Sequence, residues 1–183
     1  MMQAAAPALA PTLIGVPVLE TERLRLRGPK LVDFETFAAF LQSDRAAFVG
    51  GKQPRVQAWR AFGHLTGHWV LRGFSMFIIA DKTTDAALGM AGPWFPEGWP
   101  EPEIGWSIWD AAAEGKGVAH EAATAARAWA YDALGWTTAI SLIVDGNARS
   151  EALARRMGCQ FEGEFTHETF GKSRIFRHPA RPA

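Results

Sequence analysis

Three apolar runs, separated by short turn-forming segments, lead directly into a glycine turn and an amphipathic helix. The runs cover residues 75–80, 87–94 and 103–109, and the breaks between them contain DKTTD and the proline-rich FPEGWPEP. Short apolar or alternating runs bounded by turn residues are typical of β-strands, and short turns join antiparallel neighbours. This part of the chain therefore predicts a three-stranded antiparallel meander followed by a helix.

The chain before the meander predicts one strand and two helices. In ERLRLRG, leucines alternate with Arg23, Arg25 and Arg27, as in a strand with one face in water. Apolar residues at helical spacing then predict a helix from Asp33, a candidate N-cap, to Leu41. A looser pattern of the same kind predicts a second helix over residues 56–71.

The chain after the meander alternates helices and strands. The first helix begins at residue 118 and ends before Gly135, a candidate C-cap, and its expected apolar stripe consists of Val118, Ala122, Ala125, Trp129 and Ala133. Residues 137–144 predict a buried strand. Asn147 then caps a helix that Gly158 ends, and two short strands lie around 161–165 and 173–177.

The resulting order is one strand, two helices, three strands, a helix, a strand, a helix and two strands. It predicts an α+β fold with about seven strands and four helices. The 183 residues fit one domain, which we assign to 19–183, with 1–18 as an N-terminal tail. The sequence shows no repeat, low-complexity segment or interdomain linker.

Composition narrows the function classes. Lys+Arg and Asp+Glu are equal at 19 each, so no overall field favours nucleic acid or an anionic membrane. Cys159 is the single cysteine, which excludes an internal disulfide and suits a reducing cytoplasm. The N-terminus lacks the basic and uninterrupted apolar regions of a signal peptide, and no apolar run approaches membrane-spanning length. We expect a cytoplasmic protein.

The stretch EGKGVAHEAA places two glycines and a lysine at the start of a helix. Helix N-termini attract anions, and Gly115 and Gly117 would let main-chain amides approach a phosphate, with Lys116 adding charge. The pattern fits neither the Walker loop nor the dinucleotide-binding G-x-G-x-x-G, so neither NTP nor NAD is supported. A tight turn without a ligand is the alternative.

These features together resemble the GNAT superfamily of N-acetyltransferases, in its RimJ/RimL-like branch of ribosomal-protein N-terminal acetyltransferases. The family signature Q/R-x-x-G-x-G/A corresponds to residues 114–119, and LETERLRLR, EIGW, HEAATAARAWAYDALG and NARSEALARRMG match as well. The likeness extends over most of residues 19–179. It implies a mixed, mostly antiparallel and strongly twisted sheet whose fourth and fifth strands splay apart.

The resemblance also implies an acetyl-CoA site without a metal. It places the pyrophosphate on the turn and the pantetheine arm against main chain at the end of EIGWSIW, with Asn147 as a further contact. The implied cofactor-binding residues are Ile108, Trp109, Gly115, Lys116, Gly117, Val118, Ala119 and Asn147. Glu114 departs from the family pattern, which has Gln or Arg at this position. Because a carboxylate beside a phosphate is repulsive, only the backbone role of this residue transfers.

The candidate catalytic residues are Glu103 and Ser150. Glu103 matches the glutamate that some relatives use as general base, and Gly105 would mark a bulge whose amides stabilise the oxyanion. The tyrosine that many relatives use as acid is replaced by Ala154, which leaves Ser150 as the candidate, while Tyr131 is interpreted as packing. Alternatively, Glu103 is a solvated strand-end charge and Ser150 an ordinary first-turn serine.

The acceptor is assigned to FPEGWPEPEIGW, which mixes carboxylates with aromatic rings that could hold a cationic amine. The candidate substrate-binding residues are Trp94, Trp99, Glu101 and Trp106. A loop packed on the core is the alternative. Four kinds of acceptor stay open: a protein N-terminus, a polyamine, an amino sugar and a small amine. The sequence also leaves a homodimer open. The rival function is a non-catalytic CoA-binding or sensing module. His64 and His68 lack a third ligand for a metal.

Overall fold

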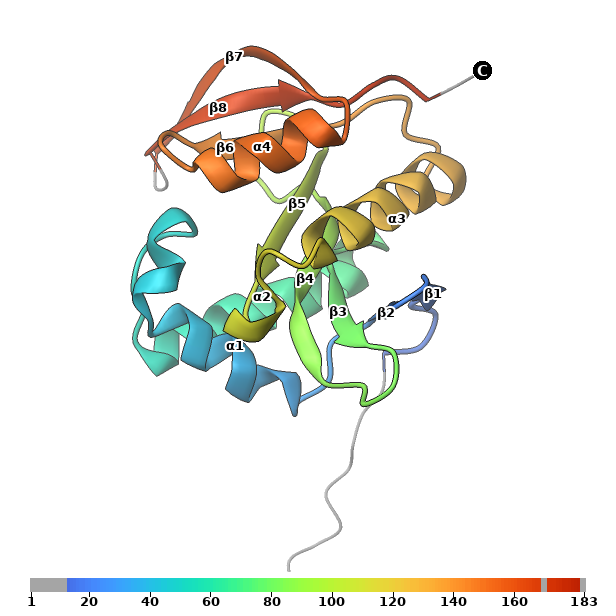
Figure 1. Cartoon of the computed structure of the whole chain (residues 1–183), viewed down its shortest axis with the longest axis vertical. Helices are drawn as coiled ribbons and strands as arrows, with labels where there is room; N and C mark the ends of the chain where they lie inside the picture. The colour runs from blue at the N-terminus through green and yellow to red at the C-terminus, as the bar shows by residue number, and fades with distance from the viewer. Residues whose placement is uncertain (1–12, 169–170, 182–183) are drawn as a thin grey trace, which may run out of the picture.

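A computed structural model describes residues 13–168 and 171–181 of the chain. The elements follow the predicted order, with one additional strand at the start that is too short to show a period of two (Figure 1). They are β1 (Leu19–Glu20), β2 (Leu24–Arg27), α1 (Asp33–Leu41), the 3-10 helix η1 (Asp44–Phe48), α2 (Arg55–Arg72), β3 (Phe77–Asp81), β4 (Ala87–Trp94), β5 (Glu103–Ile108), the 3-10 helix η2 (Ala111–Ala113), α3 (Val118–Ala133), β6 (Ile140–Val144), α4 (Ala148–Arg156), β7 (Gln160–His167) and β8 (Gly171–Arg177).

The strands form one mixed sheet in the order β1-β2-β3-β4-β5-β6-β8-β7. The meander β3-β4-β5 is antiparallel as predicted, and the pairing of β5 with β6 is parallel. That parallel pairing is confined to one register position, Glu103 opposite Ile140. Figure 1 shows β5 lying between the group β6-β8-β7 and the remaining strands. The predicted mixed, mostly antiparallel sheet with splayed strands is confirmed.

Two cores lie on the two faces of the sheet. Figure 1 shows α3 in front of the sheet and α2 behind it. One core joins α1 and α2 to β3, β4 and Trp109, and the other joins α3 and α4 to the opposite face. The buried stripe of α3 includes Ala122, Ala126 and Ala130. The predicted stripe ran instead through Ala125 and Ala133, which are not buried, so the prediction placed part of the stripe on the wrong face of the helix. Alanines at these positions let the helix approach the sheet closely.

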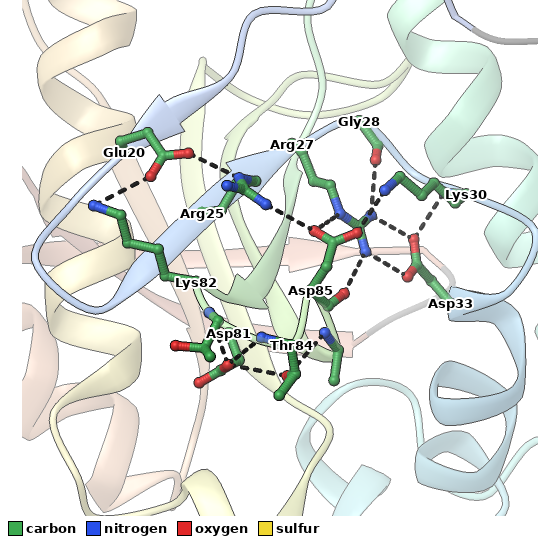
Figure 2. Close-up of polar contacts among 12 residues, drawn as sticks. Glu20, Arg25, Arg27, Gly28, Lys30, Asp33, Asp81, Lys82, Thr84 and Asp85 are labelled. Carbon is green, nitrogen blue, oxygen red and sulfur yellow. Dashed lines mark hydrogen bonds and ion pairs between the residues drawn. The ribbon is translucent and has the colours of Figure 1, made fainter.

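The start of α1 depends on a buried ion pair instead of a side-chain cap. Val32 is at the N-cap position, so the prediction of Asp33 as N-cap was wrong. Asp33 instead accepts two hydrogen bonds from Arg27, at 2.8 and 2.9 Å. Arg27 is 4% exposed and also donates to Asp85 in the β3–β4 turn (Figure 2). Arg27 therefore does not share the wet face predicted for the arginines of this strand, because it faces α1.

The predicted helix ends are otherwise confirmed. Asn147 Oδ1 accepts a hydrogen bond from Ser150 N at 3.2 Å and caps α4. Gly135 and Gly158 follow the last residues of α3 and α4 with φ of 69° and 81°, which favours glycine. The predicted tail, 1–18, is described from residue 13 onward, and there Leu13 and Val16 pack against the α3 core. Residues 1–12 lie outside the described part.

Candidate active site

The separation of β5 from β6 is produced by two side chains. Ile140 N donates to Pro102 O at 3.0 Å, as in a regular parallel ladder. The next ladder bond would join Leu142 N to Ile104 O, but Leu142 N donates to Glu103 Oε1 at 3.0 Å and Ser141 Oγ donates to Ile104 O at 2.7 Å. Because Leu142 N and Ile104 O are both satisfied by side chains, they do not bond to each other, and the ladder ends where the strands diverge.

Beyond this point, one edge of β5 faces the gap. Hydrogen bonding in an antiparallel pair alternates along each strand. Trp109 N donates to Leu88 O at 2.7 Å, so the main chain of Trp106 and Ile108 points the other way, toward the gap. Ile108 O accepts from Arg45 at 3.0 Å. Ile108 thus presents its N–H toward the gap, where the pantetheine arm was predicted. Trp109 does not, because its N–H donates to Leu88 O and its carbonyl oxygen accepts from Arg45.

A cavity of about 710 Å³ occupies the gap. Its walls come from α1, η1 and α2 on one side and from β4, β5, β6, α4 and β7 on the other. Several of the predicted site residues line it together: Trp94, Trp99, Glu103, Trp106, Asn147 and Ser150. Trp94 and Ser150, which are 56 residues apart in the sequence, therefore line the same cavity.

Glu103 is buried in the wall of this cavity, with 6% of its surface exposed. Its two carboxylate oxygens accept hydrogen bonds from Leu142 N and from the indole N–H of Trp99. Burial in an apolar wall outweighs these donors and raises the pKa of Glu103 to about 7. A carboxyl group with such a pKa can exchange a proton near neutral pH, and the interpretation of Glu103 as a solvated strand-end charge was wrong.

Ser150 lies on the α4 side of the same cavity. Its Oγ accepts a hydrogen bond from the indole N–H of Trp106 at 3.3 Å, which leaves its own hydroxyl proton available for donation. Ala154, at the position of the family tyrosine, is fully buried. Tyr131 donates to Pro179 O at 2.8 Å away from the cavity, in agreement with its interpretation as packing.

The glycine turn combines two left-handed glycines with the N-terminus of α3, an arrangement that can accommodate an anion. Gly115 and Gly117 have φ of 72° and 79°, which glycine adopts without strain. The first helical hydrogen bond of α3 runs from Glu121 N to Gly117 O, so the N–H groups of residues 118–120 have no acceptor within the helix. Arg23 binds the carbonyl of Lys116 at 3.0 Å and fixes the turn from outside.

The carboxylate of Glu114 is neutralised by two arginines. One oxygen accepts from Arg45 of η1, and the other accepts from Arg149 of α4 at 2.7 Å. These ion pairs hold the pKa of Glu114 below its usual range. The repulsion expected between this carboxylate and a phosphate is therefore reduced, and the pairs connect the turn to both sides of the cavity.

Glu101 lies outside the cavity lining. It forms a two-pronged ion pair with Arg177, at 2.6 and 2.8 Å, and Glu97 pairs with Arg72 at 3.5 Å. Gly105 also differs from expectation, because β4 and β5 keep a regular register through this position. The bulge predicted at Gly105 is absent from this pairing.

Sequence reasoning missed Arg45, Ser141 and Arg60. Arg45 and Ser141 act through main-chain partners on distant segments, for which local sequence has no signal. Arg60 lines the cavity at a helical position four residues before His64, a periodicity that could have placed both on one face. Among residues 13–168 and 171–181, no three potential ligands gather for a metal, and no helix is long and apolar enough to cross a membrane.

Residues 23–160 match the family model described as an acetyltransferase (GNAT) domain. The chain belongs to the GNAT family. An acetyltransferase from Agrobacterium tumefaciens is similar to this GNAT chain, with 30% identity and a TM-score of 0.82 over 92% of this chain and 97% of that one. A search of curated proteins finds no match.

Two ribosomal-protein acetyltransferases share the GNAT fold at lower identity. The ribosomal-protein-S5-alanine acetyltransferase from Vibrio fischeri is 17% identical, with a TM-score of 0.69 over 91% of this chain and 100% of its own. RimL, the ribosomal L7/L12 acetyltransferase, solved with coenzyme A, is 13% identical, with a TM-score of 0.71 over 89% and 98%. The family assignment makes this chain an acyltransferase, and GNAT enzymes use acetyl-CoA as the acetyl donor.

Proposed function

We propose that this GNAT enzyme transfers the acetyl group of acetyl-CoA directly to a primary amine, with Glu103 as general base and Ser150 as general acid. The observation that carries the proposal is the buried carboxyl of Glu103, whose pKa is raised to about 7 at the point where β5 and β6 separate. A base is most effective when its pKa lies near the operating pH.

The proposed reaction has no acyl-enzyme intermediate. Ionised Glu103 accepts a proton from the acceptor ammonium, directly or through one water, and the neutral nitrogen attacks the thioester carbon. The new C–N bond forms as the carbonyl oxygen becomes an oxyanion, and the C–S bond then breaks. Ser150 protonates the departing thiolate, and the second proton, which the attacking nitrogen gives up as the amide forms, restores the Ser150 hydroxyl. The free hydroxyl proton of Ser150, whose oxygen is held by Trp106, supports this role.

The cofactor side of the proposal rests on the glycine turn and the free edge of β5. The N–H groups of residues 118–120 and the left-handed Gly115 and Gly117 suit a pyrophosphate, with Lys116 beside them. Ile108 N–H and the cap residue Asn147 suit the pantetheine arm. The buried thiol of Cys159, with its pKa raised to about 11, suits a reducing cytoplasm and takes no part in the chemistry.

The test is an amine panel assayed with acetyl-CoA for free thiol and for an acetylated product by mass spectrometry. We expect at least one amine to be acetylated, and Glu103→Gln to lower the rate by about 100-fold. Glu162→Gln is the matched control, because Glu162 is exposed and pairs with Arg177 away from the cavity. Acetyl-CoA should raise the melting temperature of the wild type and of both variants.

A non-catalytic CoA-binding module is the second candidate, favoured by Ala154 at the position of the family tyrosine. It predicts the same thermal stabilisation by acetyl-CoA but no thiol release with any amine. A silent panel combined with retained acetyl-CoA binding would therefore replace the enzyme proposal.

A further inference from the structure

We infer that the acceptor is a small primary amine whose apolar, ring-sized body carries a carboxylate at the end opposite the amine. The inference rests on the proposed function, since it assigns the substrate of the same cavity. It excludes the polyamines that the sequence alone left open. Three features of the cavity carry it.

The first feature is the scarcity of negative charge. Among the residues that the structure describes, Glu103 is the one carboxylate in the cavity lining. The other two carboxylates of the predicted acceptor segment, Glu97 and Glu101, pair with arginines outside the lining. An acceptor with a second ammonium group would bury that charge without a partner, which is unfavourable.

The second feature is the apolar character of the wall. Aromatic and aliphatic side chains from five separate segments, α1, η1, α2, β4 and β7, line the cavity. They include Phe37, Phe40, Phe48, Leu65, Trp94 and Phe165. Such a surface is stabilised by an apolar body that displaces water.

The third feature is Arg60, an exposed residue of α2 that belongs to the same cavity lining. Its described hydrogen bond goes to Gln57 Oε1 at 3.5 Å, and no carboxylate of the described residues pairs with it. Arg55, one turn earlier on α2, is by contrast paired with Glu35 at 2.6 Å. A guanidinium beside a ligand cavity without a carboxylate partner is suited to bind an anionic group of the ligand.

Glu103 and Arg60 lie at different places along the cavity. Trp94 is directly opposite Glu103 in the β4–β5 pairing, and its ring lies 5.0 Å from the ring of His64. Arg60 precedes His64 by one helical turn, about 5–6 Å along the same face of α2. Trp94 and His64 therefore connect the position of the base to that of Arg60, and the proposal assigns the ring-sized body of the acceptor to this stretch of the cavity.

The test compares three amines of similar size. They are 4-(2-aminoethyl)benzoate, 2-phenylethylamine, and 4-(2-aminoethyl)benzylamine, so that the group para to the amine arm is anionic, absent or cationic. We expect kcat/KM for the benzoate to exceed that for phenylethylamine by about tenfold, and the diamine to be the poorest substrate. Arg60→Gln should remove the advantage of the benzoate, and Arg60→Glu should make the diamine the best of the three. Arg55→Gln is the control on the same helix and should keep the wild-type order.

Calorimetry with the CoA-loaded protein measures binding in parallel, so the inference is tested even where no thiol is released. Benzoate binding that weakens about tenfold in Arg60→Gln supports it. Equal rates and affinities for the three amines, or a wild-type preference for the diamine, would overturn it while leaving acetyl transfer intact. Absence of thiol release with Arg60-dependent benzoate binding would contradict the proposed function alone.

Discussion

Leu142 N donates to the carboxylate of Glu103 at 3.0 Å, in the place of the next main-chain bond between β5 and β6. Together with Ser141, which binds Ile104 O, Glu103 thus ends the ladder, and its carboxylate is the group that we propose as the base. Because burial raises its pKa to about 7, its charge state changes within the range in which the enzyme can be assayed. The geometry of the split and the proposed chemistry of the site therefore share one residue, Glu103.

Glu103 should impose an acid limb on the rate. The base must be ionised, so kcat/KM for the best amine should rise with pH through about 7. Glu103→Gln should lose this limb along with most of its rate. A pH–rate profile of both proteins checks this, and an unchanged limb in the variant would remove Glu103 from the mechanism.

Glu103 should also make stability decrease with rising pH. Its folded pKa lies above its ordinary value of 4.5, so the folded state holds more protons between these values, and the stability that this provides is lost as pH rises through about 7. Between pH 4.5 and 8 the wild type should lose about 3 kcal/mol relative to Glu103→Gln. Urea unfolding at several pH values measures the difference, and parallel curves for the two proteins would contradict it.

Ser150→Ala should lower kcat by about tenfold or more while leaving the affinity for acetyl-CoA within about twofold. The reason is that the hydroxyl acts on the leaving thiolate, whereas the cap of α4 is supplied by Asn147. Ser150→Thr retains a hydroxyl and should recover part of the rate. Steady-state kinetics together with calorimetry separate the two effects, and equal losses in both quantities would indicate a binding role.

Glu114→Gln should tighten acetyl-CoA binding by about threefold at low salt, with a smaller gain at high salt. The change removes a negative charge beside the phosphate turn and frees Arg45 and Arg149 from their carboxylate partner. Titration of acetyl-CoA at two ionic strengths gives the answer. Glu164→Gln, whose partner Lys172 lies on the remote β7–β8 hairpin, is the control. Weaker acetyl-CoA binding by Glu114→Gln would contradict the prediction and would show that Glu114 is needed to hold Arg45 and Arg149 in place beside the turn.

Arg27→Met should lower the free energy of unfolding by about 3–5 kcal/mol, because it leaves the buried carboxylate of Asp33 without its cation. Arg25→Met should have a much smaller effect, since Arg25 pairs with Glu20 at the surface. Figure 2 shows both arginines on β2 with their partners. Denaturant midpoints measure the two changes, and equal destabilisation by both would contradict the assignment.

The elements could be predicted because their signals are local. The period-two leucines of β2, the left-handed glycines after α3 and α4, and the cap at Asn147 each act within a few residues. The positions that failed depend on partners far along the chain. Asp33 was assigned a local capping role but binds Arg27, and the face of α3 that is buried was set by its contact with the sheet.

The sequence by itself determined the order of the main elements and the glycine turn, because each is expressed in spacing and residue type over short stretches, and its resemblance to the family indicated Glu103 as the candidate base. Only the tertiary structure decided that Glu103 is buried, that Glu101 is engaged by Arg177, and that Arg60 lines the same cavity. The physical reason is that pKa and ligand preference depend on desolvation and on neighbouring charges, and these come from segments that meet only when the sheet is formed.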